Sequence, residues 1–135
     1  DVGGKMVEIS AISLGNPHAV LLVDDVDAAP VRLLGPAIEQ HPRFPQKTNV
    51  GFACPITRSK LRLRVWERGV GETLACGSGA CAAVVACFRL GRIDEECEVE
   101  LPGGIAWVRW PGQGPVFLRG PAVTVYRGEI DLSTV

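Results

Sequence analysis

The residues best suited to chemistry lie between Glu67 and Gly79, in the sequence ERGVGETLACGSG. Within it, Cys76 stands directly before Gly-Ser-Gly, at the expected start of an apolar helix. The first amides of a helix lack internal hydrogen-bond partners, and the helix dipole places positive potential at that end. This field favours a thiolate, so we expect the pKa of Cys76 to lie below the ordinary thiol value of about 8.5. Because Gly77 and Gly79 have no side chains, a ligand carboxylate could approach the same amides closely.

A carboxylate held beside a thiolate is the arrangement that removal of the α-proton of an amino acid requires. We therefore interpret Cys76 as a candidate acid–base residue. The Glu67-Arg68 pair before it and the Gly-Ser-Gly after it favour this interpretation. The simpler alternative is that Cys76 is a small apolar residue leading into a helix.

Two polar clusters upstream are further candidates. Gly15-Asn16-Pro17-His18 follows an apolar segment, and an asparagine before proline is held extended, so its amide projects from a loop. His18 could titrate or orient a partner near neutral pH. The alternative is an ordinary Asn-Pro turn with a surface histidine. Thr48-Asn49 opens an apolar segment and by itself indicates only the start of a strand.

Two segments have the residue spacing of helices. Val31–Gln40 follows Pro30 and is expected to be a surface helix with one apolar stripe. The residues of that stripe are Leu33, Leu34, Ala37 and Ile38. The second segment, Ser78–Leu90, is apolar on every side from Ala80 to Phe88, so protein must surround it. Gly91 is suited to end it as a C′ residue.

Most of the remaining chain has the alternation or apolar runs of strands. The expected strands are Lys5–Ile12, Ala19–Val23, Asn49–Ile56, Lys60–Trp66, Glu96–Leu101, Gly104–Arg109, Val116–Leu118 and Val123–Arg127. Lys60–Trp66 carries cations on one face and Glu96–Leu101 carries anions, which is typical of a solvated sheet face. Short strands with one fully buried helix predict an α+β fold. In it a curved, mostly antiparallel sheet wraps around the central helix, in a single domain over residues 1–135.

Composition excludes several function classes. The chain has 135 residues, with 14 Lys and Arg against 15 Asp and Glu and a net charge of -1. Domains that bind nucleic acid through bulk charge have a clear basic excess, so we expect no nucleic-acid partner. No apolar run approaches the ~20 residues of a membrane helix, and we find no leader peptide. We therefore expect no membrane association and a cytoplasmic protein.

The five cysteines form no Cys-x-x-Cys pair, and their odd number fits a reducing compartment. Four of them lie in apolar or alternating runs and are expected to be buried structural thiols: Cys54, Cys81, Cys87 and Cys97. His18 and His41 lie far from any regular ligand spacing, so we expect no metal site. Lys5, Lys47 and Lys60 could in principle form a pyridoxal Schiff base, but none lies in a motif, so we expect no cofactor.

Several motifs occur in the order in which a known family has them. They are Gly15-Asn16-Pro17-His18, Phe44-Pro45 with Thr48-Asn49-Val50, the stretch Glu67–Gly79, Leu101-Pro102-Gly103-Gly104 and Gly120-Pro121-Ala122. Together they resemble the C-terminal half of the diaminopimelate epimerase family. The resemblance covers nearly the whole chain, and its long central motif is highly specific.

The resemblance implies a cofactor-independent epimerase with two cysteines on opposite faces of the substrate α-carbon. One cysteine removes the proton as a thiolate, and the other delivers a proton as a thiol. The reaction interconverts LL- and meso-diaminopimelate on the route to lysine and peptidoglycan. By this resemblance, Cys76 is the second catalytic cysteine, and the amides of Gly77 and Ser78 hold the reacting α-carboxylate.

The same resemblance assigns the other site residues. Asn16, Asn49 and Arg68 would grip the distal end of the substrate, where the planar guanidinium of arginine can bind a carboxylate through two hydrogen bonds. Glu67 would assist Cys76, and His18 would assist the other cysteine. Ser78 stands where the family often has threonine, which supplies the same amide and a hydroxyl.

The family is about twice this length, and its first half supplies the other cysteine. We therefore expect this chain to lack the N-terminal lobe, which would be its partner, and to be inactive alone. The family's C-terminal tail packs on that first half, so Val123–Gly128 is expected to fray or to pair with a second copy in a homodimer. Alternatives are a lobe of a related proline racemase or phenazine-pathway isomerase, or a non-catalytic binding module with a structural Cys76. A cysteine hydrolase would need a paired histidine.

Overall fold

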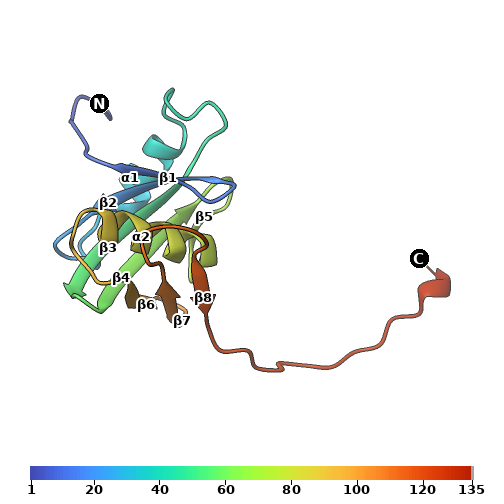
Figure 1. The fold of residues 1–135 in the computed structure, drawn as a ribbon. Helices are drawn as coiled ribbons and strands as arrows, with labels where there is room; N and C mark the ends of the chain where they lie inside the picture. Colours follow the sequence, from blue (N-terminus) through green and yellow to red (C-terminus); the bar gives the residue numbers. More distant parts are fainter. Residues whose placement is uncertain (135) are drawn as a thin grey trace.

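Eight strands form one curved sheet in the computed structural model, which describes residues 1–134 (Figure 1). The strands are β1 (Ser10–Ser13), β2 (Pro17–Leu22), β3 (Asn49–Thr57), β4 (Lys60–Glu67), β5 (Gly71–Thr73), β6 (Glu96–Leu101), β7 (Gly104–Arg109) and β8 (Phe117–Arg119). Their order is β1-β2-β3-β4-β6-β7-β8, and β5 pairs with β4. The β2–β3 and β4–β6 pairs are parallel, and the other five are antiparallel. The expected curved, mostly antiparallel sheet is confirmed.

One helix covers each face of the sheet. Successive strand residues point to opposite faces, so Val20 of β2 packs toward α2 (Gly77–Arg89), whereas Ala19 and Leu21 pack toward α1 (Val31–Glu39). In β4, one face supplies the core around α2 through Leu61, Leu63 and Val65. The buried side chains around α2 and those around α1 form two clusters, which together make up the core.

The helix α2 is the buried central helix that its sequence predicts. Its residues Gly79–Cys87 are all buried. Gly91 follows it with φ 68°, donating to the carbonyl of Phe88, while Arg92 donates to that of Cys87. These two bonds satisfy carbonyls of the last turn, and the left-handed conformation they need suits glycine. Among the described residues, neither this helix nor α1 is long and apolar enough to cross a membrane.

The helix α1 turns a different stripe to the sheet than its spacing predicts. Leu33 is 73% exposed, whereas Glu39 is buried with Val31, Gly35 and Ile38. The reason is steric, because a Cβ on Gly35 would lie 2.6 Å from Cγ of Trp66. The Gly35 side of α1 therefore lies against the Trp66 indole. In this orientation of the helix, Glu39 faces the protein interior.

Two of the expected strands differ in the structure. Of Lys5–Ile12 only the end pairs, in β1, and Met6 is exposed. Val123–Arg127 forms no strand in the single chain, because the tail leaves the body of the molecule after β8 (Figure 1). Large apolar side chains along the tail are exposed: Val123, Val125, Tyr126, Ile130 and Leu132. The tail ends in the short 3-10 helix η1 (Leu132–Thr134).

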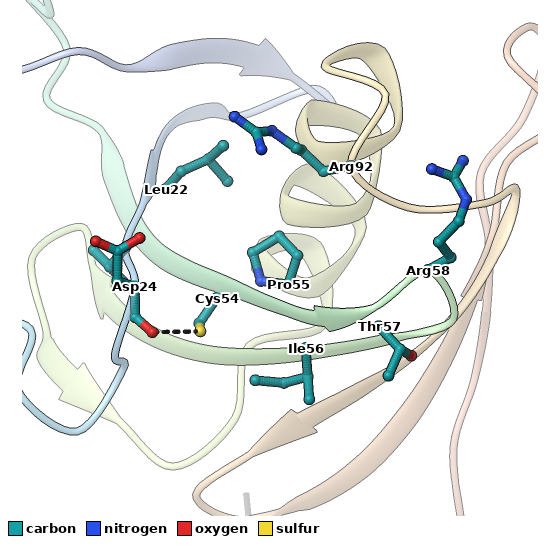
Figure 2. Close-up of a pocket in the computed structure, with 9 residues that line it drawn as sticks. Leu22, Asp24, Cys54, Pro55, Ile56, Thr57, Arg58 and Arg92 are labelled. Atoms are coloured by element: carbon teal, nitrogen blue, oxygen red, sulfur yellow. Dashed lines mark hydrogen bonds between the residues drawn. The ribbon is translucent and has the colours of Figure 1, made fainter.

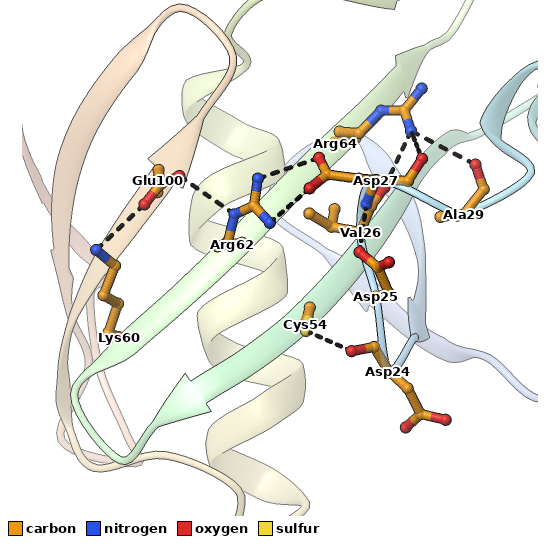
Figure 3. A network of polar contacts seen from close by, with 10 residues as sticks. All are labelled: Asp24, Asp25, Val26, Asp27, Ala29, Cys54, Lys60, Arg62, Arg64 and Glu100. Carbon is orange, nitrogen blue, oxygen red and sulfur yellow. Dashed lines mark hydrogen bonds and ion pairs between the residues drawn. The ribbon is translucent and has the colours of Figure 1, made fainter.

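The two oppositely charged strands are neighbours. Lys60 and Arg62 of β4 lie opposite Glu98 and Glu100 of β6 in a parallel register. Lys60 Nζ lies 3.1 Å from Glu100 Oε2, and Arg62 Nε lies 3.2 Å from Glu100 Oε1. Figure 3 shows Arg62 bridging from Glu100 to Asp27, in the loop between β2 and α1. This outer face of the sheet is thus tied to that loop.

Candidate active site

The polar motifs meet at one edge of the sheet. The parallel strands β2 and β3 begin there, with His18 opposite Asn49. Because β4 runs antiparallel to β3, its end at Glu67 reaches the same edge. The N-terminus of α2 arrives beside them, where Asn16 Nδ2 donates to Ser78 Oγ at 3.3 Å across 62 residues of sequence.

Cys76 is the N-cap residue of α2. Its backbone is extended, and its Sγ accepts a hydrogen bond from the Gly79 amide at 3.3 Å. Ser78 Oγ lies 3.7 Å from the same sulfur. The first bond of the helix runs from the Ala80 amide to the Cys76 carbonyl, so the amides of Gly77 and Ser78 precede it and have no partner within the helix. Gly77 is exposed, so a ligand could reach this turn.

The expected low pKa of Cys76 is wrong for this chain. Burial raises the pKa of the thiol, since the side chain is only 8% exposed, and the carboxylate of Glu67 raises it further. The hydrogen bonds from Gly79 and Ser78 act in the opposite direction but do not outweigh them. The helix terminus does donate to the sulfur as expected, but the cost of desolvating a thiolate is larger. At neutral pH Cys76 is therefore a protonated thiol.

Glu67 is oriented by Thr73, which lies in the Glu67–Gly79 motif but has no role predicted from the sequence. Thr73 of β5 donates from Oγ1 to Glu67 Oε1 at 2.6 Å. Strand β5 pairs with the end of β4, with Glu67 opposite Gly71. The short strand thus fixes the carboxylate on the side where it acts on Cys76.

His18 is buried rather than on the surface, with an exposed fraction of 2%. Its Nε2 lies 3.1 Å from Asn16 Oδ1, which can only accept, so Nε2 carries the proton. Burial lowers the pKa of His18, and the nearby Arg68 lowers it further, while Glu67 raises it. His18 is therefore neutral at pH 7 and bonded to Asn16, which is in turn bonded to Ser78.

Asn49 and Arg68 hold the backbone at this edge. The amide of Asn49 donates from Nδ2 to the Pro17 carbonyl at 3.0 Å and accepts at Oδ1 from the Arg68 N–H at 3.0 Å. The guanidinium of Arg68 is exposed and donates from Nη1 to the Gln46 carbonyl at 3.1 Å. A pocket of about 300 Å³ lies beside it, lined by Ser13, Gly15, Asn16, Pro17, Arg43, Phe44, Pro45, Gln46 and Lys47.

The structure brings all the candidate residues to one edge, through direct contacts or neighbouring strand positions. Glu39, which sequence reasoning missed, also reaches this edge from α1. No motif marks it, because a glutamate at the end of an amphipathic helix is ordinarily exposed. No group of three metal-ligating side chains lies together within residues 1–134.

Of the other cysteines, Cys81 lies on α2 close enough to Cys76 for the two thiols to interact. The four others are buried free thiols, as their apolar surroundings predict. Figure 2 shows Cys54 at the far end of β3, where its Sγ donates to the Asp24 carbonyl at 3.2 Å. It lines a separate pocket of about 440 Å³ with Arg58 and Arg92.

Comparisons with known proteins agree in family and in fold. Residues 10–125 match the family model described as diaminopimelate epimerase. The curated diaminopimelate epimerase of Ectopseudomonas mendocina is 58% identical over 133 residues, which are 98% of this chain and 48% of that protein. That of Acidovorax ebreus is 58% identical over 126 residues, 92% of this chain and 43% of that protein. The chain spans about half the length of the curated relatives it matches.

Solved structures with low sequence identity share the fold. A phenazine biosynthesis protein of the PhzF family from Enterococcus faecalis has a TM-score of 0.56 and 17% identity, covering 77% of this chain and 39% of that chain. A PhzF-family protein from Bacillus anthracis has a TM-score of 0.53 and 18% identity, covering 76% and 34%. These two solved structures therefore share the fold of this chain.

Proposed function

This chain belongs to the diaminopimelate epimerase family, and from that membership we propose that it is one lobe of a cofactor-independent epimerase. The completed enzyme would interconvert LL- and meso-diaminopimelate in the cytoplasm, for lysine and peptidoglycan biosynthesis. The observation that supports this most is the cluster itself. A thiol at a helix N-terminus, a carboxylate beside it and a neutral histidine nearby form an acid–base site.

The proposed reaction uses two cysteines, one on each face of the α-carbon. In one direction a thiolate from the complementary half removes the Cα proton, and the Cys76 thiol delivers its own proton to the opposite face. The C–H bond that forms replaces the one that breaks, and the two cysteines exchange protonation states. The raised pKa of Cys76 suits the proton-delivering role in this resting form. In the reverse direction Cys76 acts as the thiolate that removes the Cα proton. The nearby carboxylate of Glu67 would stabilise that proton on the Cys76 sulfur.

Substrate would lie across the start of α2. The amides of Gly77 and Ser78 can bind the α-carboxylate, because they lie at the positive end of the helix. Asn16, Asn49 and Arg68 would hold the distal amino-acid end. For Arg68 this means exchanging its bond to the Gln46 carbonyl for two bonds to a carboxylate.

We propose that the chain alone is inactive. It offers one cysteine to one face of the α-carbon, and the water-excluded site needs a second lobe. The exposed tail after β8 would pair with that lobe or with a second copy of this chain in a homodimer.

The test compares this chain with a fusion in which the remaining half of the Ectopseudomonas mendocina relative precedes it. Both are incubated with LL-diaminopimelate in deuterated water, and deuterium at Cα and meso product are measured. We expect activity only in the fusion, lowered about 10²–10⁴-fold by Cys76→Ala. Cys54→Ala, a buried cysteine far from the site, is the matched control and leaves the rate unchanged.

Either of two results would overturn the proposal. Turnover by this chain alone, abolished by Cys76→Ala, would remove the need for a second lobe. An inactive fusion that is folded would favour a different substrate within the same fold, or a binding module in which Cys76 is structural.

A further inference from the structure

Glu39 is a buried carboxylate that belongs to none of the motifs. It is the last residue of α1, and its exposed fraction is 5%. Its Oε2 accepts a hydrogen bond from Trp66 Nε1 at 2.7 Å, and its Oε1 accepts one from the Gly69 amide at 2.9 Å. Lys47 Nζ lies 3.9 Å from Oε1. Both carboxylate oxygens are thus used, each by a neutral N–H donor.

The two donors stand on either side of Glu67 and Arg68. Trp66 precedes this pair in β4, and Gly69 follows it with φ 75°, in the left-handed region that favours glycine. The Arg68 amide is held separately by Asn49 Oδ1. The chain therefore leaves β4 through a turn whose consecutive amides, those of Arg68 and Gly69, bind two buried side-chain acceptors.

The position of α1 is matched to this turn. The helix lies directly on Trp66 at Gly35, where a Cβ would come within 2.6–2.8 Å of three indole or Cβ atoms. Glu39 follows one turn later on the same face and reaches past the indole to Gly69. The helix, the indole and the turn are therefore joined by direct contacts.

We propose that Glu39 is a positioning residue for the epimerase reaction, which holds the Trp66–Gly69 segment so that Glu67 faces Cys76 and Arg68 faces the substrate. This inference rests on the proposed function, which gives Glu67 and Arg68 their roles. Glu39 touches neither the reacting atoms nor the substrate, and it acts through the backbone of the turn.

A carboxylate is the side chain that this position requires. The two N–H donors face two acceptor oxygens, whereas a glutamine offers one oxygen and one NH₂ group, so one donor would meet another donor. Burial opposes ionisation of Glu39, but the bonds from Trp66 and Gly69 and the charge of Lys47 outweigh it and keep its pKa below the ordinary value. The carboxylate is thus ionised at neutral pH.

The first test uses Glu39→Gln in the fusion with the complementary half. We expect kcat/KM to fall by roughly 10–10²-fold, because small displacements of catalytic and binding groups have effects of that size. Since the turn carries Glu67 for the chemical step and Arg68 for substrate binding, kcat should fall and KM should rise together. Ile38→Val, on the same helix and equally buried, is the matched control for stability and leaves both constants unchanged.

A double variant separates positioning from simple loss of stability. Trp66→Phe removes the indole donor, so the amide of a glutamine at position 39 can turn its oxygen to Gly69 without opposing a second donor. The penalty of Glu39→Gln should therefore be smaller in the Trp66→Phe background than in the parent. Equal penalties in the two backgrounds, or an effect of Glu39→Gln no greater than that of Ile38→Val, would overturn the proposal.

A second readout uses this chain alone and does not depend on activity. In ¹⁵N NMR spectra, Glu39→Gln should shift the Gly69 amide and the Trp66 indole N–H, the latter assigned by its loss in Trp66→Phe. The Arg68 amide should shift with them, whereas Ile38→Val should leave all three in place. If the fusion is inactive, the proposed function fails while these shifts still decide whether Glu39 holds the turn. Unshifted Gly69 and Arg68 signals would disprove the positioning role itself.

Discussion

Thr73 Oγ1 donates to Glu67 Oε1 at 2.6 Å, so a threonine on β5 orients the carboxylate at the end of β4. Thr73→Val keeps the shape of the side chain and removes this bond. Hydrogen bonds to charged groups are worth about 1.5–3 kcal/mol, so we expect kcat of the fusion to fall by at least about tenfold. The deuterium-incorporation assay measures this directly.

Thr73→Ser is the matched control, because it retains the donor hydroxyl. It should recover most of the activity that Thr73→Val loses. If the valine variant is as active as the parent, then Glu67 is held without Thr73, and the short strand β5 has no part in orienting it.

The protonation of Cys76 can be tested by alkylation of this chain. Since its pKa is raised by burial and by Glu67, the rate of reaction with iodoacetamide should still be increasing with pH above 7. Glu67→Gln removes the negative charge and should increase the rate at Cys76 at a given pH. Peptide mapping by mass spectrometry gives the rate for each cysteine.

Glu72→Gln serves as the control in this experiment, because the carboxylate of Glu72 is bonded to Arg64 and Arg32. It should not change the rate at Cys76. A plateau of the parent rate below pH 7 would show an ionised thiol instead, and the effect of burial would then be smaller than the effect of the helix terminus.

Alkaline pH should destabilise the fold through Cys87. Burial raises its pKa to about 12, whereas an unfolded chain loses the thiol proton near pH 9. Between these values the folded state keeps a proton that the unfolded state has lost. Cys87 by itself therefore lowers the free energy of unfolding by about 1.4 kcal/mol per pH unit in this range, and its stabilising contribution is fully present below pH 9. Urea unfolding at pH 8, 9 and 10 measures this slope.

Cys87→Ala should flatten the slope relative to the parent. Ile38→Val removes a buried methyl group without removing a titrating group, so it should lower stability equally at every pH. Burial also raises the pKa values of Cys76, Cys81 and Cys97, and the bonds to Glu100 and Glu98 raise that of Lys60, but these groups titrate in all three proteins. Identical slopes for Cys87→Ala and the parent would contradict the prediction.

Arg64 ties the loop before α1 to the sheet. It donates from Nε to Glu72 Oε1 at 2.8 Å and from Nη1 to the Val26 carbonyl at 2.9 Å (Figure 3 shows the carbonyl contacts). Lysine cannot make both contacts, so Arg64→Lys should lower the free energy of unfolding by about 1–3 kcal/mol. Arg109→Lys alters an ion pair that is more than half exposed, with Glu95, and should change little. Chemical denaturation of the two variants compares them directly.

Much of the fold follows from local pattern. The alternation of Glu96–Leu101 predicts β6, and the apolar run Gly104–Arg109 predicts β7, both at their observed bounds. The uniformly apolar segment after Cys76 predicts a helix enclosed by protein, because nothing else could cover it. These features depend on residues close together in sequence.

Other features depend on tertiary contacts that no local pattern encodes. The rotation of α1 is set by the contact of Gly35 with Trp66, 31 positions later in the sequence. The pKa of Cys76 is decided by burial more than by its helix. Val123–Arg127 has the residue pattern of a strand, yet it pairs with no strand in the described part of the chain. Of the candidate site, the motif residues were recognised, but Thr73 and Glu39 take their roles only from the pairing of β5 and the packing of α1.

The bond from Asn16 to Ser78 has a consequence for how the chain folds. It joins positions 62 residues apart, and it brings the segment before β2 to the N-terminus of α2. Closing such long loops costs entropy that is recovered only when the distant contacts form. The cluster around Cys76 is therefore complete only when this distant contact is made. The burial and the nearby charge of Glu67 that raise the pKa of Cys76 are therefore properties of the folded chain.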